Sequence, residues 1–436
     1  MIINPQVPLH RLVLSLSEAL DHVHPKVVDH QQRVAYIAST MAHCMNVAAP
    51  DLVRLLCAAS LHDIGLIGVE NRLAALHPGQ LESVDWHGEV GYVLLREVPL
   101  LAPGADLVRY HHVAWADGRG AEVNGLPVPP AAHILALADA VERAVDRRVP
   151  ILEQYKAILE RLAEQGSAQF HPDCLAALLE VARAEAFWLD AVSDRIYGVL
   201  LKQTNWPRVP IDEVTLGPMA EIFGRLVDAA TPWTAVHTAG VTATAVALAQ
   251  RLNFSGREQH LMRAAGFLHD LGKLAVPVQI LDKAGPLDAK ELAVVRGHTY
   301  HTFRILDTIG GMPQVAEWAA FHHERIDGQG YPFHHAGEVL TLGSRIVAVA
   351  DVFTAVAEDR PYRQGMTQSG ATDLLRHLAA TGGLDGDVVA ALYRDYDAID
   401  ALRREAQAAY AVKQRELVDL MRGGAAQTHA LAASRN

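Results

Sequence analysis

The sequence predicts an all-α protein built from two similar helical domains in tandem. Alanine and leucine recur at helical spacing, as in VTATAVALAQRL from residue 241 and CLAALLEVARAEAFWL from residue 174. The chain has 436 residues, which is too long for one average domain. An internal repeat of histidines and aspartates then divides the chain into two halves.

Composition excludes several functional classes. The formal net charge of −12 argues against binding to nucleic-acid polymers or anionic membranes, although a local basic pocket could hold a phosphate. The three cysteines, Cys44, Cys57 and Cys174, form no C-x-x-C pair and predict reduced thiols. The chain contains no run of membrane-spanning length, and its start, MIINPQVPLHRLVLSLSEALDH, does not resemble a signal peptide. We therefore expect a cytoplasmic protein.

Seven positions in each half carry the repeat. A histidine precedes each His-Asp dipeptide by 32 residues, and another precedes a His-His pair by 24. An aspartate follows each His-His pair after 27 or 28 residues. The first set is His30, His62, Asp63, His87, His111, His112 and Asp139, and the second is His237, His269, Asp270, His298, His322, His323 and Asp351. Such agreement in order and spacing indicates an internal duplication.

The domain boundaries follow from proline and glycine. We expect a first domain over residues 1–202, a linker over 203–218, a second domain over 219–420 and a flexible tail over 421–436. The stretch TNWPRVPIDEVTLGP, with Pro207, Pro210 and Pro218, interrupts the helical pattern. The final RGGAAQTHALAASRN is typical of a frayed end.

The repeated residue types favour a centre of two metal ions. Histidine and aspartate suit borderline divalent ions such as iron, manganese, zinc or nickel, and helical bundles build core metal sites from such residues. Adjacent ligands on one helix project about 100° apart, so one can bind a first ion while its neighbour reaches a second. Seven ligands suit two ions bridged by an aspartate and a hydroxide, which can clamp a phosphodiester. A single buried histidine would more simply satisfy a core hydrogen bond, but the ordered set favours metal.

On these residues the second half resembles the HD-GYP family, the cyclic dinucleotide phosphodiesterases of the HD superfamily. The shared motifs lie between about residues 230 and 400: HTAGV, LHDLGKLAVP, ILDKAGPL, GHTYHTFRIL, HHERIDGQGYP, RIVAVADVF and EDRPYR. The resemblance implies two divalent ions, with iron or manganese favoured and nickel, zinc or magnesium left open. It implies metal ligands at His237, His269, Asp270, His298, His322, His323 and Asp351, with Asp270 bridging.

The resemblance also implies contacts to the substrate. Lys273 would contact the scissile phosphate and act in catalysis together with Asp270. Arg360 and Arg363 of EDRPYR are candidates for phosphate or guanine contacts, or else surface ion-pair partners. The Gly-Tyr-Pro loop would form one wall of the cleft. Trp233 stands where some family members carry a glutamate for a third metal, so two ions are favoured over three.

The first half departs further from the family pattern. Leu66 replaces the phosphate lysine, HHVAWADGRGAE lacks Tyr-Pro, and DRRVPI retains Arg148 but not the later arginine. Lys26 lies four residues before His30, where a cation would disfavour metal. We expect a degenerate domain that regulates or scaffolds the second half. Whether its seven residues still bind metal stays open.

We therefore expect a bacterial signalling enzyme that hydrolyses a cyclic dinucleotide by attack of a metal-bridging hydroxide. Cyclic di-GMP is the favoured substrate, and the product is a linear dinucleotide that could be cleaved further to mononucleotides. The alternatives are 3′,3′-cyclic GMP-AMP as the substrate, or a non-catalytic cyclic dinucleotide sensor. A generic HD hydrolase of ppGpp would leave the Gly-Tyr-Pro loop unexplained. The input signal, a signalling protein partner and a homodimer are left open.

Overall fold

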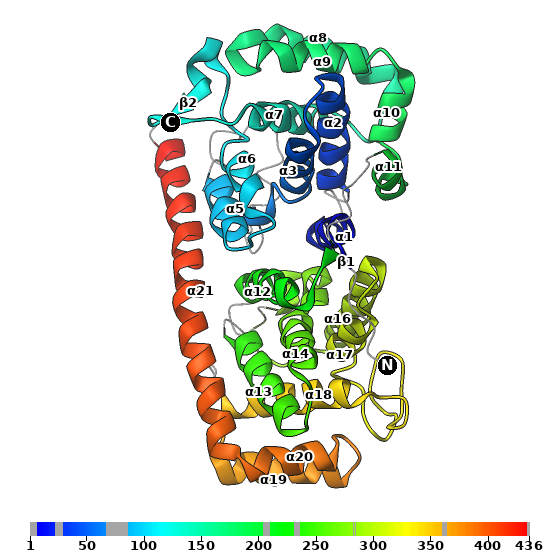
Figure 1. Ribbon diagram of the computed structural model, residues 1–436, viewed down its shortest axis with the longest axis vertical. Coiled ribbons are helices and arrows are strands. Elements are labelled where there is room, and N and C mark those ends of the chain that lie inside the picture. The colour runs from blue at the N-terminus through cyan, green and yellow to red at the C-terminus, as the bar shows by residue number, and fades with distance from the viewer. Residues whose placement is uncertain are drawn as a thin grey trace. The chain divides into compact units, whose positions relative to one another are not determined.

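The protein is described by a computed structural model over residues 7–21, 29–66, 86–203, 210–230, 236–281, 283, 285–359 and 364–433. These residues are mainly helical and contain only four two-residue strands, which confirms the all-α prediction (Figure 1). They fall into two compact units. The C-terminal unit comprises Met1–Ser15 and Val209–Val418, and the N-terminal unit comprises Leu16–Arg208 and Asp419–Asn436. No helix of the described ranges is long and apolar enough to span a membrane.

The N-terminal unit is a bundle around helices α2, α3 and α7, which pack on one another. Prolines occupy the first turns of α3, α7 and α9, where the missing N–H costs no helical hydrogen bond. Its elements are α2 (His30–Cys44), α3 (Ala49–Ser60), η2 (Ile64–Leu66), α5 (Trp86–Arg96), η4 (Ala102–Gly104), α6 (Ala105–Arg109), η5 (Ala116–Ala121), β2 (Glu122–Val123), β3 (Leu126–Pro127), α7 (Pro130–Arg143), α8 (Ile151–Gln169), α9 (Pro172–Val181), α10 (Glu185–Ala191) and α11 (Ile196–Gln203).

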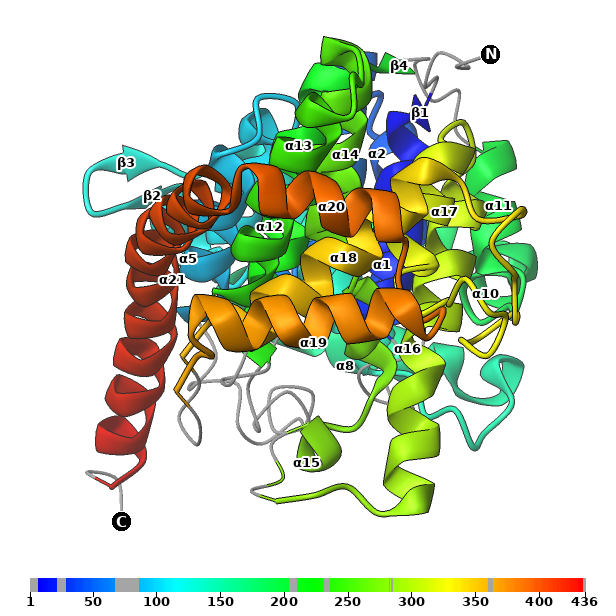
Figure 2. The same ribbon diagram turned by 90° about the horizontal axis from the view of Figure 1, so that it is seen from below.

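The C-terminal unit packs α13 against both α14 and α18, and α12 against α14. Figure 2 shows α19 and α20 side by side next to α18, in agreement with their contacts. Its elements are β1 (Val7–Pro8), β4 (Pro210–Ile211), α12 (Glu213–Ala230), α13 (His237–Arg251), α14 (Gly256–Leu268), η7 (Leu271–Ala275), α15 (Val278–Leu281), α16 (Ala289–Ile309), α17 (Pro313–Ala320), α18 (Leu342–Ala357), α19 (Gln368–Ala380) and α20 (Gly386–Arg394). Two further helices, α1 (Leu9–Asp21) and α21 (Tyr396–Ala433), contain residues of both units.

Local signals explain where several of these helices begin. Ser255 and Glu258 form a reciprocal capping box at the start of α14. Asp288 and Glu291 do the same for α16. These caps satisfy backbone N–H groups that a helix start otherwise leaves without a partner.

Two segments differ from the sequence-based expectation. Pro218, which we assigned to an interrupted linker, lies inside α12 at the sixth position of that helix. At this position proline removes the hydrogen bond to the carbonyl four residues earlier, so α12 continues through Pro218 at the cost of one backbone hydrogen bond. The region expected as a tail continues the helix, since α21 extends to Ala433. Residues 204–209 of the expected linker lie outside the described ranges.

The duplication is visible in the order of elements. Helices α2, α3, α5, α6 and α7 have their counterparts in α13, α14, α16, α17 and α18. The short 3₁₀ segments η2 and η7 occupy the same place in each series, directly after a His-Asp dipeptide. Each unit therefore positions its seven candidate residues on the same five helices and the turns that follow them.

Candidate metal centre

The His-Asp and His-His pairs lie in turns rather than in helices. In the C-terminal unit α14 ends at Leu268, His269 is its C-cap, and Asp270 precedes η7. His322 and His323 follow α17, which ends at Ala320. Our expectation that adjacent ligands project from a regular helix is therefore wrong. A turn allows two neighbouring side chains to face the same centre, whereas neighbours on a helix diverge by about 100°.

Gly272, from the HDLGK motif, permits this turn to approach α16 closely. A methyl group at Gly272 would overlap the backbone oxygen of His298. Thr302 of α16 fixes the approach, since its hydroxyl accepts from Gly272 N at 2.9 Å and donates to His269 O at 3.1 Å. In the N-terminal unit, a methyl group at Gly65 would overlap the backbone oxygen of His87 in the same way. The glycine of each motif thus serves the contact between turn and helix.

Asp270 is central to the C-terminal group, because its two carboxylate oxygens face opposite sides. Oδ2 lies 3.2 Å from His269 Nε2, and Oδ1 lies 3.3 Å from His298 Nε2 and 4.0 Å from His322 Nε2. On the His269 side, Asp351 Oδ1 lies 3.0 Å from His237 Nε2. A carboxylate in this position has the geometry to serve two ions at once.

All seven predicted positions are brought together in this unit. Their side-chain atoms form potential ligand groups that share members: His237, His269 and Asp351; His269, Asp270 and His322; and His298, His322 and His323. The set is buried except for His323, which is partly accessible. His269 Nε2 is buried and has no hydrogen-bond partner among the described residues. A buried donor set with an unsatisfied imidazole nitrogen fits a metal ion.

Backbone carbonyls set the orientation of three of the histidines. His269, His298 and His322 each donate Nδ1–H to the carbonyl three residues earlier, at 2.7–2.8 Å. This bond fixes the tautomer and leaves Nε2 directed at the centre. His62 and His111 of the N-terminal unit make the same bond.

His237 is oriented instead by Glu358, a residue to which the sequence analysis assigned no role. Glu358 is buried, and its Oε1 accepts from His237 Nδ1 at 3.0 Å. Its Oε2 accepts from the Gln407 amide of α21 at 3.0 Å. A carboxylate behind a ligand histidine raises the basicity of the imidazole and holds its orientation. Glu358 lies seven residues after Asp351 and therefore on the same helical face, which is the signal that could have identified it.

The pKa values divide the histidines into two groups. Burial alone would lower the pKa of His237, but its hydrogen bonds to Asp351 and Glu358 raise it to about 10. Burial lowers the pKa of His298 to about 3 and holds that of His322 well below its usual value. Metal ligands must be neutral imidazoles, so the second group is ready to bind, whereas His237 must release a proton.

Lys273 lies where the sequence analysis predicted a cation beside the centre. Its Nζ is 2.5 Å from Asp270 Oδ2. Burial would lower the pKa of Lys273, but the Asp270 carboxylate raises it above the ordinary value. The side chain therefore keeps its positive charge next to the candidate bridging carboxylate.

The Gly-Tyr-Pro loop packs against the exposed side of the histidine group. Tyr331 N donates to His323 O at 3.2 Å, and the two rings lie 5.0 Å apart. The loop is held by Glu324, whose buried carboxylate accepts from Phe333 N at 2.7 Å. Arg296 lies over the Tyr331 ring at 4.4 Å, and the sequence analysis did not single it out. This loop thus borders the one partly accessible ligand candidate.

Four residues that the sequence analysis placed at or beside a centre lie outside the described ranges. They are Lys26, Trp233, Arg360 and Arg363. The predicted substrate contacts of the two arginines therefore stay predictions.

The N-terminal unit also brings its seven positions together. Asp63 Oδ2 lies 3.5 Å from His30 Nε2, and Asp63 Oδ1 lies 3.2 Å from His87 Nε2. His87 Nε2 is in turn 3.1 Å from His111 Nε2 and 3.2 Å from His112 Nε2. The carboxylate again faces two sides.

Two features distinguish the N-terminal centre from the C-terminal one. His30 Nδ1 donates to Glu142 at 2.5 Å, so Glu142 takes the role of Glu358 from a position three rather than seven residues past the aspartate. Arg143 Nη2 lies 2.5 Å from Asp139 Oδ2. The sequence analysis noted the loss of charge at Leu66 and missed this arginine.

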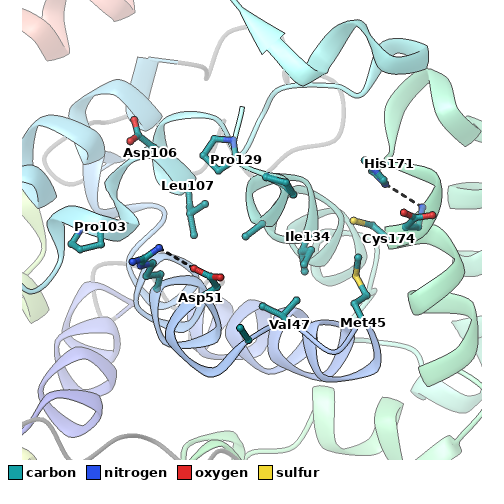
Figure 3. Close-up of a pocket in the computed structure, with 15 residues that line it drawn as sticks. Met45, Val47, Asp51, Pro103, Asp106, Leu107, Pro129, Ile134, His171 and Cys174 are labelled. Atoms are coloured by element: carbon teal, nitrogen blue, oxygen red, sulfur yellow. Dashed lines mark hydrogen bonds and ion pairs between the residues drawn. The ribbon is translucent and has the colours of Figure 1, made fainter. Parts of the chain in front are cut away.

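A pocket of about 680 Å³ opens elsewhere in the N-terminal unit (Figure 3). It is lined mainly by apolar side chains, among them Met45, Leu107 and Ile134, and its mouth carries the Asp51–Arg54 ion pair. It is lined by residues of α6 and α9, of the N-terminal ends of α3 and α7, and of the segments next to these helices. None of the lining residues is one of the seven candidate ligands of this unit, so the pocket is separate from the centre.

Replacing Glu358 by glutamine should weaken metal binding while leaving the fold intact. The amide oxygen can still accept from His237 Nδ1, but the charge that raises the basicity of the ring is lost. Loss of such a partner typically costs about 10- to 100-fold in metal affinity. Competition with a chelator measures it, with the exposed Glu338→Gln as the control. Equal affinities for the two variants would contradict a role for Glu358.

Comparisons with known proteins agree with this geometry. Family models for the HD domain match residues 27–144 and 221–388. A 3′3′-cGAMP-specific phosphodiesterase of Vibrio cholerae is 29% identical over 402 residues, covering 89% of this chain and 92% of the relative. A cyclic di-GMP phosphodiesterase of Pseudomonas aeruginosa is 40% identical over 152 residues, covering 35% of this chain and 36% of the relative.

The fold is also found among solved structures. A cyclic GMP-AMP-specific phosphodiesterase of V. cholerae superposes with a TM-score of 0.61 at 21% identity, covering 90% of this chain and 98% of the other. At that identity the likeness concerns the fold alone. The two HD matches each contain one of the two sets of seven residues. The chain therefore carries two HD domains in tandem, an architecture that fits the HD-GYP type.

Proposed function

We propose that the protein is a metal-dependent phosphodiesterase that hydrolyses a cyclic dinucleotide at the C-terminal centre. One observation carries the proposal: the two oxygens of Asp270 face two separate groups of histidines, with Lys273 beside them. An arrangement of this kind suits a pair of divalent ions acting on a phosphodiester.

The chemistry of the donor set supports two ions. Imidazole nitrogens and carboxylates suit iron, manganese, zinc and nickel, and iron or manganese is our choice from the resemblance. We propose that His237, His269 and Asp351 hold one ion, that His298, His322 and His323 hold the other, and that Asp270 serves both. Bound ions would supply positive charge to the phosphodiester and lower the pKa of the attacking water.

The protein's own residues then orient the reaction. Glu358 and the backbone carbonyls behind His269, His298 and His322 keep the imidazoles in place. The Lys273 ammonium group, paired with Asp270 in this structure, can instead contact a phosphate oxygen and stabilise the negative charge that develops there. Tyr331 and Arg296 border the accessible side at His323, where an aromatic ring and a guanidinium suit a nucleotide.

Two cyclic dinucleotides are candidate substrates. Cyclic di-GMP is favoured by the motifs of the C-terminal unit, and it is the substrate in the name of the P. aeruginosa relative. The second candidate is 3′,3′-cyclic GMP-AMP, because the V. cholerae relative that aligns over 92% of its length is specific for it. Both present the same phosphodiester to the centre, so the choice depends on contacts to the bases.

The test is turnover by the full chain loaded anaerobically with iron or manganese. We expect either cyclic dinucleotide, or both, to yield a linear dinucleotide, identified by chromatography and mass spectrometry against a chelator-treated control. The ratio of kcat/KM for the two substrates then defines specificity. Tight binding of a cyclic dinucleotide without any product would instead establish a sensor.

A further inference from the structure

The two centres carry their cations on different aspartates. In the C-terminal unit Lys273 pairs with Asp270, which faces both histidine groups. In the N-terminal unit the position of Lys273 is Leu66, and the cation is Arg143, paired with Asp139. The position equivalent to Arg143, four residues after Asp351, is Ala355. The C-terminal unit therefore has its cation on the aspartate of the His-Asp pair, whereas the N-terminal unit has its cation on the last aspartate of the set, Asp139.

Asp139 serves only one side of the N-terminal centre. Its Oδ1 lies 3.4 Å from His30 Nε2 and 3.8 Å from His62 Nε2. We call this group, His30, His62 and Asp139 with Asp63 Oδ2, the His30 sub-site. The nitrogens His30 Nε2 and His62 Nε2 are buried and have no hydrogen-bond partner among the described residues, so the group has the shape of an ion site.

One arginine pairs with a ligand carboxylate of the His30 sub-site, and a second pairs with the carboxylate that supports His30. Arg143 Nη2 lies 2.5 Å from Asp139 Oδ2, one helical turn along the same helix. Arg147 forms an ion pair with Glu142, the carboxylate that accepts from His30 Nδ1. A guanidinium next to a ligand carboxylate repels a divalent ion at short range in a buried site.

The other side of the N-terminal centre is better suited to an ion. We call this group, His87, His111 and His112 with Asp63 Oδ1, the three-histidine sub-site. Its ligand atoms lie 3.1–3.2 Å from His87 Nε2. Three imidazoles and one carboxylate form a complete set for a divalent ion.

We propose that the N-terminal centre is a one-ion site, in which the three-histidine sub-site binds a divalent ion and Arg143 keeps the His30 sub-site from holding a second. The inference rests on the metal dependence proposed above. Lys273 does not impose the same restriction in the C-terminal centre, because its flexible chain can carry its single charge to a substrate phosphate. Arg143 lies one turn from its aspartate on the same helix and pairs with it directly.

The experiment is metal counting on the full chain with Arg143→Leu. After anaerobic loading with manganese and removal of excess ion, this variant should bind about one more ion per chain than the wild type, since a neutral side chain restores Asp139 as a ligand. Arg148→Leu is the matched control: it removes the same charge five residues away, but its side chain is 89% exposed and pairs with Asp146. Arg143→Lys keeps the charge and should keep the wild-type count.

Thermal melting provides a second measurement, which stays informative when the variant is less stable than the wild type. Without metal, Arg143→Leu leaves the buried Asp139 carboxylate without its cation, so the Tm should fall below that of the wild type. Added manganese should then raise the Tm more in Arg143→Leu than in the wild type, because an additional ion binds the folded state. Arg148→Leu should follow the wild type in both conditions.

The outcomes separate this inference from the proposed function. If Arg143→Leu binds no more metal than the wild type while His269→Ala/Asp270→Ala loses ions, the one-ion inference is overturned and the C-terminal centre stands. If His269→Ala/Asp270→Ala also retains its full metal content, the metal assignment of the proposed function fails as well. An extra ion in Arg143→Leu that disappears on adding His30→Ala would locate it at the His30 sub-site.

Discussion

Replacing Asp270 by alanine should abolish hydrolysis and reduce the metal content of the C-terminal centre. One carboxylate oxygen lies 3.2 Å from His269 Nε2 and the other 3.3 Å from His298 Nε2, so the change removes a contact on both sides. It also leaves Lys273 as an unpaired positive charge beside the remaining ligands, which disfavours a divalent ion. We expect turnover to fall by more than about 10³-fold, beyond the loss of a single transition-state donor.

Steady-state kinetics with elemental analysis measures both effects. Asp307→Ala, which removes an exposed carboxylate from α16, is the control and should match the wild type. Full metal content together with normal turnover in Asp270→Ala would contradict the bridging role.

Lys273→Ala provides the complementary case within the same centre. Removing this cation should leave metal bound, because it takes positive charge away from Asp270. Turnover should nevertheless fall by about 10²- to 10³-fold, the scale of losing one charged donor in the transition state. Lys283→Ala, which affects an exposed ion pair with Glu291, is the control. The contrast between metal loss in Asp270→Ala and metal retention in Lys273→Ala distinguishes a ligand from a substrate contact.

The seven residues of each centre could be predicted from the sequence because their spacing is repeated. Chain order and the 32- and 24-residue intervals survive duplication, so they identify positions without knowledge of the fold. The supporting carboxylates Glu142 and Glu358 escaped this comparison because they lie three and seven residues past their aspartates. Both offsets put the carboxylate on the same helical face, so an alignment by face rather than by interval would have paired them.

The turn geometry and the ion pairs could not be predicted in the same way. The sequence does not show that α14 ends at Leu268, so that His269 and Asp270 face one centre from a turn. Nor does it show that Arg143 reaches Asp139, although a spacing of four on a helix permits the contact. Leu66 replaces the lysine after the His-Asp pair, but the cation of the N-terminal centre comes from α7, in the form of Arg143.

Disabling one centre at a time should assign the activity to the C-terminal unit. With His269 and Asp270 both replaced by alanine, hydrolysis by the full chain should disappear, although the N-terminal centre keeps all seven of its candidate ligands. With His62 and Asp63 replaced, hydrolysis should persist, at a changed rate or affinity if the N-terminal unit regulates. The two double variants remove the same residue types from equivalent turns, so each serves as the other's control for the effect on folding.

The expected asymmetry follows from charge and from the substrate side of each centre. In the C-terminal unit Lys273 lies on the shared aspartate, and Tyr331 packs on His323 beside it. In the N-terminal unit Leu66 is buried and apolar at the position of the lysine, while Arg143 is held on the closing aspartate. Losing one donor to the transition state costs about 3–4 kcal/mol of transition-state stabilisation. A centre without a lysine at this position therefore catalyses more slowly even when metal is bound. Residual turnover of a cyclic dinucleotide by the His269→Ala/Asp270→Ala variant, measured against the chelator-treated protein, would show that Arg143 can replace that lysine and that the N-terminal centre is a catalyst in its own right.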